Sequence, residues 1–206
     1  MQNIYIFLAL GITSWGYMIY YKSIEKNITE SNIVSWILWT IIGSNIMLNI
    51  LFSSNDKAEI IQGIILFLGP LFISVALYRK GKAKWGKVSG FEKICISWAI
   101  ILLISIIYFK FFPVNIKYFT EIISISIIIL DFIVFLPLLV YIFKNPETEN
   151  PKPWIIWIFA NPIAILAIED YSFAAISFLL YMTTLMPLVA FYIIIKTKQK
   201  KLLTNS

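Results

Sequence analysis

The sequence predicts an all-α membrane protein with seven transmembrane helices, arranged as two parallel three-helix bundles joined by a linker helix (3+1+3). Three observations support this fold class. The 206 residues are 60% hydrophobic and only 14% charged, with a mean hydropathy of +0.84. Apolar stretches of membrane-spanning length follow one another along the chain. A segment early in the sequence also recurs near its middle, which predicts two related halves.

Each apolar stretch is interpreted as one helix, because a bilayer core of about 30 Å needs roughly 20 apolar residues per helix. The stretches that reach or approach this length are 4–21, 33–52, 59–78, 94–112, 118–143, 154–170 and 173–195. They lack the alternation of polar and apolar residues that a membrane barrel requires, as the run from Ile122 to Phe135 illustrates. Little of the chain remains outside them, so no separate soluble domain is expected.

The internal repeat relates residues 24–39 to residues 142–157 at a constant offset of 118. The residues that recur are Ile24, Lys26, Asn27, Asn32, Trp36, Ile37 and Trp39, which match Ile142, Lys144, Asn145, Asn150, Trp154, Ile155 and Trp157. In both copies a short charged loop follows an apolar stretch, and the next stretch begins with Trp-x-x-Trp. Internal repeats of membrane spans are typical of secondary transporters, which bind solute where the repeats meet.

The repeat also predicts the domain organisation. Residues 1–80 form the first three-helix repeat, residues 81–115 a basic loop and the linker helix, and residues 116–206 the second repeat with a basic tail. Three helices cross the membrane an odd number of times, so a second copy would enter it inverted. The stretch 94–112 supplies the additional crossing that makes the two repeats parallel.

The positive charges predict the orientation in the membrane. With seven spans, 14 Lys and Arg residues fall on one side, and only Lys57, Lys110 and Lys117 fall on the other. Because cytoplasmic loops are enriched in Lys and Arg, we expect a multi-pass cell-membrane protein with its N-terminus outside and its C-terminus in the cytoplasm. This placement accounts for the net charge of +6 without a nucleic-acid partner. Lysines beside the membrane are expected to contact anionic lipid.

The two repeats share a pattern in which a kink is followed by a basic residue and then by an aromatic-rich helix. The pattern reads Ile19, Lys26, Ser35 and Trp36 in the first repeat, and Pro137, Lys144, Pro153 and Trp154 in the second. In this respect the chain resembles the PQ-loop/SWEET group of seven-span transporters, although it contains no Pro-Gln pair. The resemblance implies a solute carrier of 3+1+3 architecture. The richness in Ile, Lys and Asn suggests an AT-rich prokaryotic genome.

Asp131 is the leading candidate for solute binding. It lies at the middle of the stretch 118–143, where a carboxylate costs roughly 2.5–3.5 kcal/mol to insert and must therefore face the interior or water. It would accept hydrogen bonds from a polar solute or carry a proton, or it would serve as a structural partner for polar groups on other helices. At the offset of 118 its counterpart is Thr13, at the same depth.

Four further residues are candidates for lining the solute path. Trp39 and Trp157 lie one turn deeper than the first Trp of each pair and could stack on a solute, although tryptophans near a membrane interface also form aromatic belts. Asn161 shares a helix face with Trp157, and Asn45 lies in the second stretch. Buried amides either hydrogen-bond neighbouring helices or contact a solute.

The chain lacks the side chains that many other functions need. It contains no histidine and a single cysteine, Cys95, so we expect no metal site, no cofactor and no enzymatic activity. We therefore predict an integral membrane carrier for a small polar solute that works by alternating access. The alternative is a non-transporting receptor or scaffold of the same fold. The sequence leaves open the identity of the solute and the formation of a homo-oligomer.

Overall fold

The computed structural model describes residues 2–29, 31, 33–53, 57–80, 90–112, 119–168, 171 and 173–204. In these ranges every regular element is a helix, which confirms the all-α prediction. The elements are α1 (Gln2–Glu25), α2 (Ile33–Ser53), α3 (Lys57–Arg79), α4 (Gly90–Phe111), α5 (Phe119–Lys144), the short 3-10 helix η1 (Pro146–Thr148), α6 (Pro151–Ala167) and α7 (Phe173–Thr204). Two residues named in the sequence predictions, Asn32 and Lys117, fall outside the described ranges. So do Lys82, Lys84 and Lys87, which belong to the 14 basic residues predicted for one side of the membrane.

Six of these helices, all except α6, are long and apolar enough to cross a membrane. The helix α6 has 17 residues and contains Pro162, which places it at the short end of the range for a transmembrane helix. Large apolar side chains such as Phe7, Phe111 and Leu188 are exposed on the outer surface, as expected where lipid replaces water. By length and composition the chain is therefore a multi-pass membrane protein.

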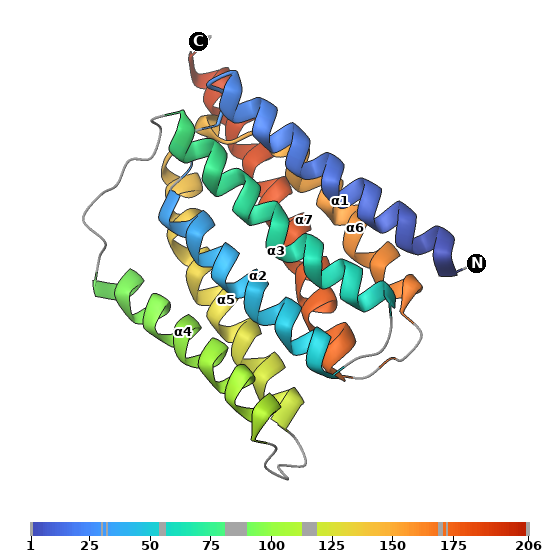
Figure 1. The fold of residues 1–206 in the computed structure, drawn as a ribbon. Helices are drawn as coiled ribbons and strands as arrows, with labels where there is room; N and C mark the ends of the chain where they lie inside the picture. The colour runs from blue at the N-terminus through green and yellow to red at the C-terminus, as the bar shows by residue number, and fades with distance from the viewer. Residues whose placement is uncertain are drawn as a thin grey trace.

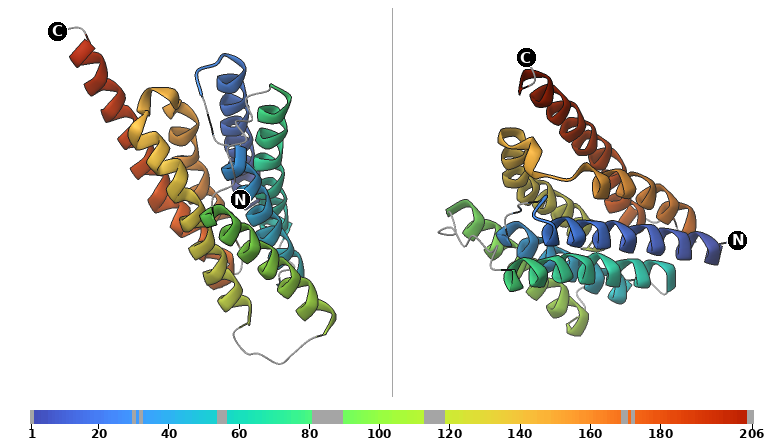
Figure 2. Two further views of the ribbon diagram at one scale, coloured as in Figure 1. Left: turned by 90° about the vertical axis from the view of Figure 1, so that its left-hand side faces the viewer. Right: turned by 90° about the horizontal axis from the view of Figure 1, so that it is seen from above.

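The helices pack in a fixed order. The helix α3 contacts both α1 and α2, while α7 contacts both α5 and α6. Further close packing joins α1 to α6 and α2 to α5. The first three helices lie on one side of the molecule and the last three on the other, as the left view of Figure 2 shows. The termini lie at opposite ends of the bundle (Figure 1).

The helix α4 lies at the edge of the bundle, against α2 and α5 (Figure 1). It is apolar around most of its circumference, so the sequence alone does not reveal which face is buried. One stripe at helical spacing faces the other helices, and it consists of Cys95, Ala99, Leu102 and Ile106. The remaining large side chains of this helix, Ile101 and Ile104 among them, are exposed.

Most of the described lysines lie at the end of the bundle where α1 and α5 finish and α2 and α6 begin. We call this the basic end. Its lysines include Lys22, Lys26, Lys80, Lys144, Lys152, Lys196 and Lys198, whereas Lys57 and Lys110 belong to the opposite end. One of the lysines, Lys80, forms an ion pair of 2.6 Å with Glu25 and thereby links α3 to the end of α1.

The chain leaves α1 through a Schellman motif that the sequence makes possible. Asn27 has a φ of 57°, a left-handed conformation that asparagine tolerates better than most residues. The backbone N–H of Asn27 donates to the Ile24 carbonyl at 3.1 Å, and that of Ile28 donates to the Ser23 carbonyl at 2.9 Å. These bonds satisfy carbonyl groups at the helix end and direct the following loop back toward the bundle.

The loop of the second repeat differs, because the counterpart of Asn27 is Asn145, which has a φ of −133° and is followed by η1. Asn150 caps α6, because its side chain accepts a hydrogen bond of 3.1 Å from the backbone N–H of Lys152. The amide of Asn150 also donates to the Ser23 hydroxyl at 2.5 Å. The loop between α5 and α6 is therefore tied to the end of α1, and this contact joins the two halves of the chain at the basic end.

Candidate solute-binding cavity

A cavity of about 90 Å³ lies in the centre of the bundle and is lined from six helices, all except α4. A water molecule takes up about 30 Å³ in the liquid, so the cavity has room for about three waters. Five of the six residues predicted to bind solute line it. These residues are Thr13, Trp39, Asp131, Trp157 and Asn161. The sequence-predicted candidates thus gather at one place, with the exception of Asn45.

The lining follows the internal repeat. Six pairs of residues separated by 118 positions contribute both of their members to this one cavity. The pairs are Thr13 with Asp131, Tyr17 with Phe135, Trp36 with Trp154, Trp39 with Trp157, Ile42 with Ala160 and Gly43 with Asn161. Residues far apart in the sequence therefore face a common space in the register that the repeat defines.

Aromatic side chains form a closed ring of contacts on the side of the cavity toward the basic end. Packed aromatic pairs ordinarily have ring centroids about 4.5–7 Å apart. The six distances between neighbours in this ring all fall between 4.8 and 6.2 Å. The six side chains in order are Tyr20, Trp36, Trp39, Phe135, Trp154 and Trp157. They come from α1, α2, α5 and α6, so the ring spans both halves of the chain.

Asp131 is only 1% exposed, so its side chain faces the protein interior as predicted. The hydroxyl of Tyr181, on α7, donates to its carboxylate at 3.0 Å. Thr183, two residues further along α7, donates instead to the carbonyl of Leu179 in its own helix. The rotation of α7 about its axis thus turns Tyr181, rather than Thr183, toward Asp131.

Thr13 lies in the same lining, and its hydroxyl is buried without a hydrogen-bond partner. Its carbonyl accepts a hydrogen bond of 3.3 Å from the indole N–H of Trp157. This contact depends on Gly16, because a Cβ at that position would overlap the Trp157 indole. The close approach of Trp157 to α1 therefore requires glycine there. An unpartnered buried hydroxyl is costly unless something binds it, so Thr13 is suited to contact a solute.

Asn161 and its register partner show why the two halves of the cavity differ. The Asn161 amide donates to the Trp157 carbonyl at 3.2 Å. At the equivalent position, Gly43, a Cβ would overlap the Leu66 carbonyl, because α2 and α3 pack there backbone to backbone. The first half has no room for an amide at this depth, whereas the second half does.

Asn45 lies elsewhere. It is fully buried, and its amide donates to the Ala99 carbonyl of α4 at 3.1 Å and to the Ile41 carbonyl of its own helix at 3.0 Å. It belongs to the contact between α2 and α4 and is not among the residues that line the central cavity. Its geometry matches the structural alternative, in which an amide joins neighbouring helices.

A second polar cluster closes the basic end, and sequence reasoning missed its central member, Glu149. This carboxylate is 3% exposed and accepts hydrogen bonds from the Trp154 indole at 3.0 Å and from the Tyr20 hydroxyl at 3.3 Å. Burial raises the pKa of Glu149 to about 8, against the opposing effect of these two donors. In the first repeat Ser31 holds the equivalent place and accepts from the Trp36 indole at 2.8 Å.

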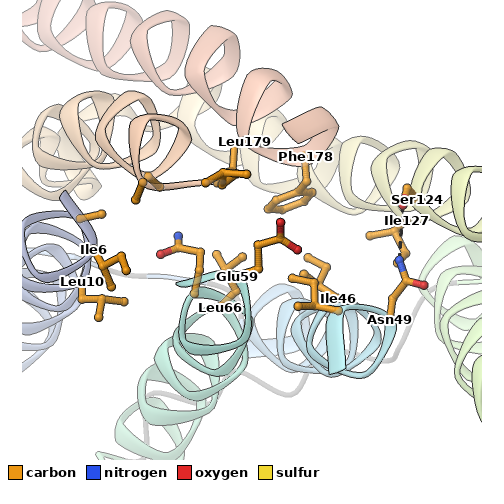
Figure 3. Close-up of a pocket in the computed structure, with 16 residues that line it drawn as sticks. Ile6, Leu10, Ile46, Asn49, Glu59, Leu66, Ser124, Ile127, Phe178 and Leu179 are labelled. Carbon is orange, nitrogen blue, oxygen red and sulfur yellow. Dashed lines mark hydrogen bonds between the residues drawn. The ribbon is translucent and has the colours of Figure 1, made fainter. Parts of the chain in front are cut away.

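A smaller cavity of about 50 Å³ lies at the opposite end of the bundle (Figure 3). We call it the outer cavity. It shares Ile46, Leu66 and Phe178 with the lining of the central cavity, so these three side chains separate the two spaces. Glu59 points into it, with its carboxylate toward Phe178 (Figure 3). Gln62, one turn further along α3, is also part of the lining.

Glu59 and Gln62 were not candidates in the sequence, since an acidic residue in the first turn of a helix is ordinarily solvated. Both are only 7% exposed, and the Gln62 amide nitrogen is buried without a partner. The sequence did contain a signal for these two residues, because the spacing i, i+3 places both polar side chains on one face of an otherwise apolar helix. Nothing in the sequence, however, shows that this face turns inward.

The chemistry of the two cavities is acidic and aromatic. Each contains one carboxylate, from Asp131 or Glu59, and none of the described residues that line them is Lys or Arg. In the described part of the chain no group of His, Cys, Asp and Glu side chains could hold a metal ion. The arrangement is suited to binding a small solute in a largely apolar space that contains a few polar groups.

Comparison of the chain with protein-family models, with curated proteins and with solved structures finds no match. The resemblance to the PQ-loop/SWEET group thus remains a prediction from the sequence pattern.

Proposed function

We propose that the chain is a membrane carrier for a small polar solute, and that the central cavity is its binding site. The observation that carries this proposal is the cavity itself, in which a buried carboxylate and an unpartnered buried hydroxyl occur at matching positions of the repeat, Asp131 and Thr13. Buried ionisable groups within membrane spans mark solute or ion pathways by default, and repeat-built carriers bind solute where their repeats meet.

The proposed architecture is two parallel three-helix units, α1–α3 and α5–α7, with α4 as the linker. Several packing relations support it. The third helix of each group packs between the other two, and the contacts of α1 with α6 and of α2 with α5 would exchange under a twofold rotation along the membrane normal. The six register pairs around the cavity are those that such a rotation would superpose.

Alternating access gives a role to the two ends of the cavity. At the basic end, the aromatic ring and the Glu149 cluster close the space, whereas the outer cavity approaches it from the other end. We propose that the basic end is cytoplasmic, following the positive-inside rule. Release of solute to the cytoplasm would then require the hydrogen bonds of Glu149 with Tyr20 and Trp154 to break as one unit rocks against the other.

The orientation is tested by labelling single cysteines in a variant that lacks Cys95. We expect Lys198→Cys, at the basic end, to react with a membrane-impermeant maleimide only after the cells are opened. Lys57→Cys should react in intact cells. Both side chains are exposed, so both should be fully reactive in detergent, which serves as the control. Labelling of both positions from the same side would refute the seven-span topology.

Transport itself is tested in proteoliposomes with glucose, serine, lysine and choline as radiolabelled probes, after a thermal-shift screen against the same compounds. We expect saturable counterflow of at least one of them. Asp131→Asn preserves the shape of the side chain and should reduce that flux by about tenfold or more while the protein still folds. A variant with unchanged flux would exclude Asp131 from the site.

A non-transporting receptor or scaffold of the same fold is the alternative, and one observation favours it. The aromatic rings contact each other directly around the seam between the halves, which is the packing expected if the seam never opens. Accessibility distinguishes the two functions. In a carrier, Ser31→Cys should become reactive from the cytoplasmic side when transported solute is present, whereas in a scaffold its reactivity should not change.

A further inference from the structure

We propose that the solute of the central cavity is a small organic cation that carries an alkylated ammonium group. This inference rests on the proposed function and specifies the class of solute. It depends on three features of the cavity, namely the faces of its aromatic side chains, the sign of its charge and its size.

The indole N–H groups of the aromatic lining are all engaged within the protein. Trp36 donates to Ser31, Trp154 to Glu149 and Trp157 to the backbone carbonyl of Thr13, while Trp39 donates to Asp131. A sugar needs many hydrogen-bonding groups around it, and these indoles do not offer theirs. Ring faces, by contrast, attract cations through their quadrupole, most strongly in tryptophan, and cages of this kind recognise alkylated ammonium groups.

Asp131 supplies the one carboxyl group among the described residues that line the cavity. Asp131 is buried there, and its two hydrogen-bond donors, the Tyr181 hydroxyl and the Trp39 indole, are neutral. No Lys or Arg is among the described residues that line the cavity. A buried carboxylate without a cationic partner is unfavourable, and a bound ammonium group would supply that partner. An anionic solute would face repulsion from Asp131, and a neutral solute would leave the carboxylate uncompensated.

The size of the cavity agrees with this class. A volume of about 90 Å³, the space of about three waters in the liquid, admits only a small solute. A compact head group such as trimethylammonium suits this space, and a disaccharide does not. The ring of six aromatic side chains at the basic end also favours a compact, roughly spherical head group over an extended one.

The outer cavity extends the same chemistry along the path. Its carboxylate, Glu59, points toward Phe178, which belongs to both cavities (Figure 3). A cation that enters from this end would meet Glu59 first, then the ring of Phe178, and then the aromatic lining around Asp131. Buried Gln62, whose amide nitrogen has no partner, provides a polar group for a hydroxyl or carbonyl carried by the solute.

Binding of choline and of its neutral isostere, 3,3-dimethyl-1-butanol, to the purified full-length protein tests the inference. The two compounds have the same shape and differ in charge. We expect choline to bind with at least about tenfold higher affinity and to quench tryptophan fluorescence, because it would contact Trp39 and Trp157. Equal affinities, or binding of glucose or serine but not of choline and tetramethylammonium, would overturn the inference.

Variants give an independent measurement. Asp131→Asn should lower the affinity for choline by about tenfold or more and leave that for the isostere unchanged. The matched control is Glu121→Gln, which removes a carboxylate from the far end of the same helix and should alter neither affinity. If Asp131→Asn does not fold, Trp39→Leu replaces it and should weaken choline binding more than isostere binding. An equal effect on both compounds in the folded variant would contradict the inference.

Counterflow separates this inference from the proposed function. Selective choline binding without counterflow would refute the carrier and leave the cation site in place. Counterflow of glucose or serine without any binding of choline would refute the cation site and leave the carrier in place.

Discussion

Glu149 allows the packing at the basic end to be tested through the pH dependence of stability. Its carboxyl group is buried between α1 and α6, and its pKa rises from an ordinary value of 4.5 to about 8. Between these two pH values the folded protein holds a proton at Glu149 that the unfolded chain has released. The contribution of this group to the free energy of unfolding should therefore be fully present below pH 4.5, fall as the pH rises, and level off above about pH 8.

The size of the effect follows from the same two values. One pKa unit corresponds to about 1.4 kcal/mol. The interval between pKa values of 4.5 and about 8 therefore sets an upper limit of about 5 kcal/mol on the loss in the free energy of unfolding. Local opening of the cluster would admit water to the ionised carboxylate, so we expect a loss of about 1–3 kcal/mol between pH 5 and 8. Glu149→Gln keeps an oxygen that accepts a hydrogen bond but cannot ionise, so its stability should lack this dependence.

The measurement is equilibrium unfolding in mixed micelles, followed by tryptophan fluorescence from pH 5 to 8.5. The matched control is Glu121→Gln, since Glu121 lies at the opposite end of α5 and is only half-buried. Tyr20→Phe removes a donor that lowers the pKa of Glu149, so the pH at which the loss of stability levels off should move upward and the total loss should increase. If the wild type and Glu149→Gln had the same pH dependence, Glu149 could not be buried as described.

Two further predictions concern packing and the division between binding and structural amides. Gly16→Ala should destabilise the protein by about 1–3 kcal/mol and shift its tryptophan emission, because the new methyl group would overlap the Trp157 indole. The matched control is Gly11→Ala, which has open space at its Cβ and should be neutral or slightly stabilising. Equal stabilities of the two variants would contradict the close approach. Asn161→Ala should weaken solute binding about tenfold, whereas Asn45→Ala should lower thermal stability and leave binding unchanged. If Asn45→Ala weakened solute binding and Asn161→Ala only lowered thermal stability, the roles assigned to the two amides would be wrong.

Much of the candidate site could be predicted because the repeat is a property of the sequence itself. Asp131, Thr13, Trp39 and Trp157 were selected by depth and register, and the structure places all four in one cavity. Of Asn45 and Asn161, the sequence favoured the second as a site residue, because it shares a helix face with Trp157. Only the packing of α4 shows that the first of these reaches the Ala99 carbonyl.

The sequence alone determined the helical structure and the membrane character. Lipid offers no hydrogen bonds to the backbone, so long apolar runs must satisfy their backbone hydrogen bonds within helices. Which face of each helix turns inward was decided only by the tertiary structure. In lipid both faces of a helix can be apolar, so the periodicity that marks the buried face of a soluble helix is weak. Glu59 and Glu149 became visible as buried groups only through this packing, and the partner of Glu149 on α1, Tyr20, is 129 residues away in the sequence.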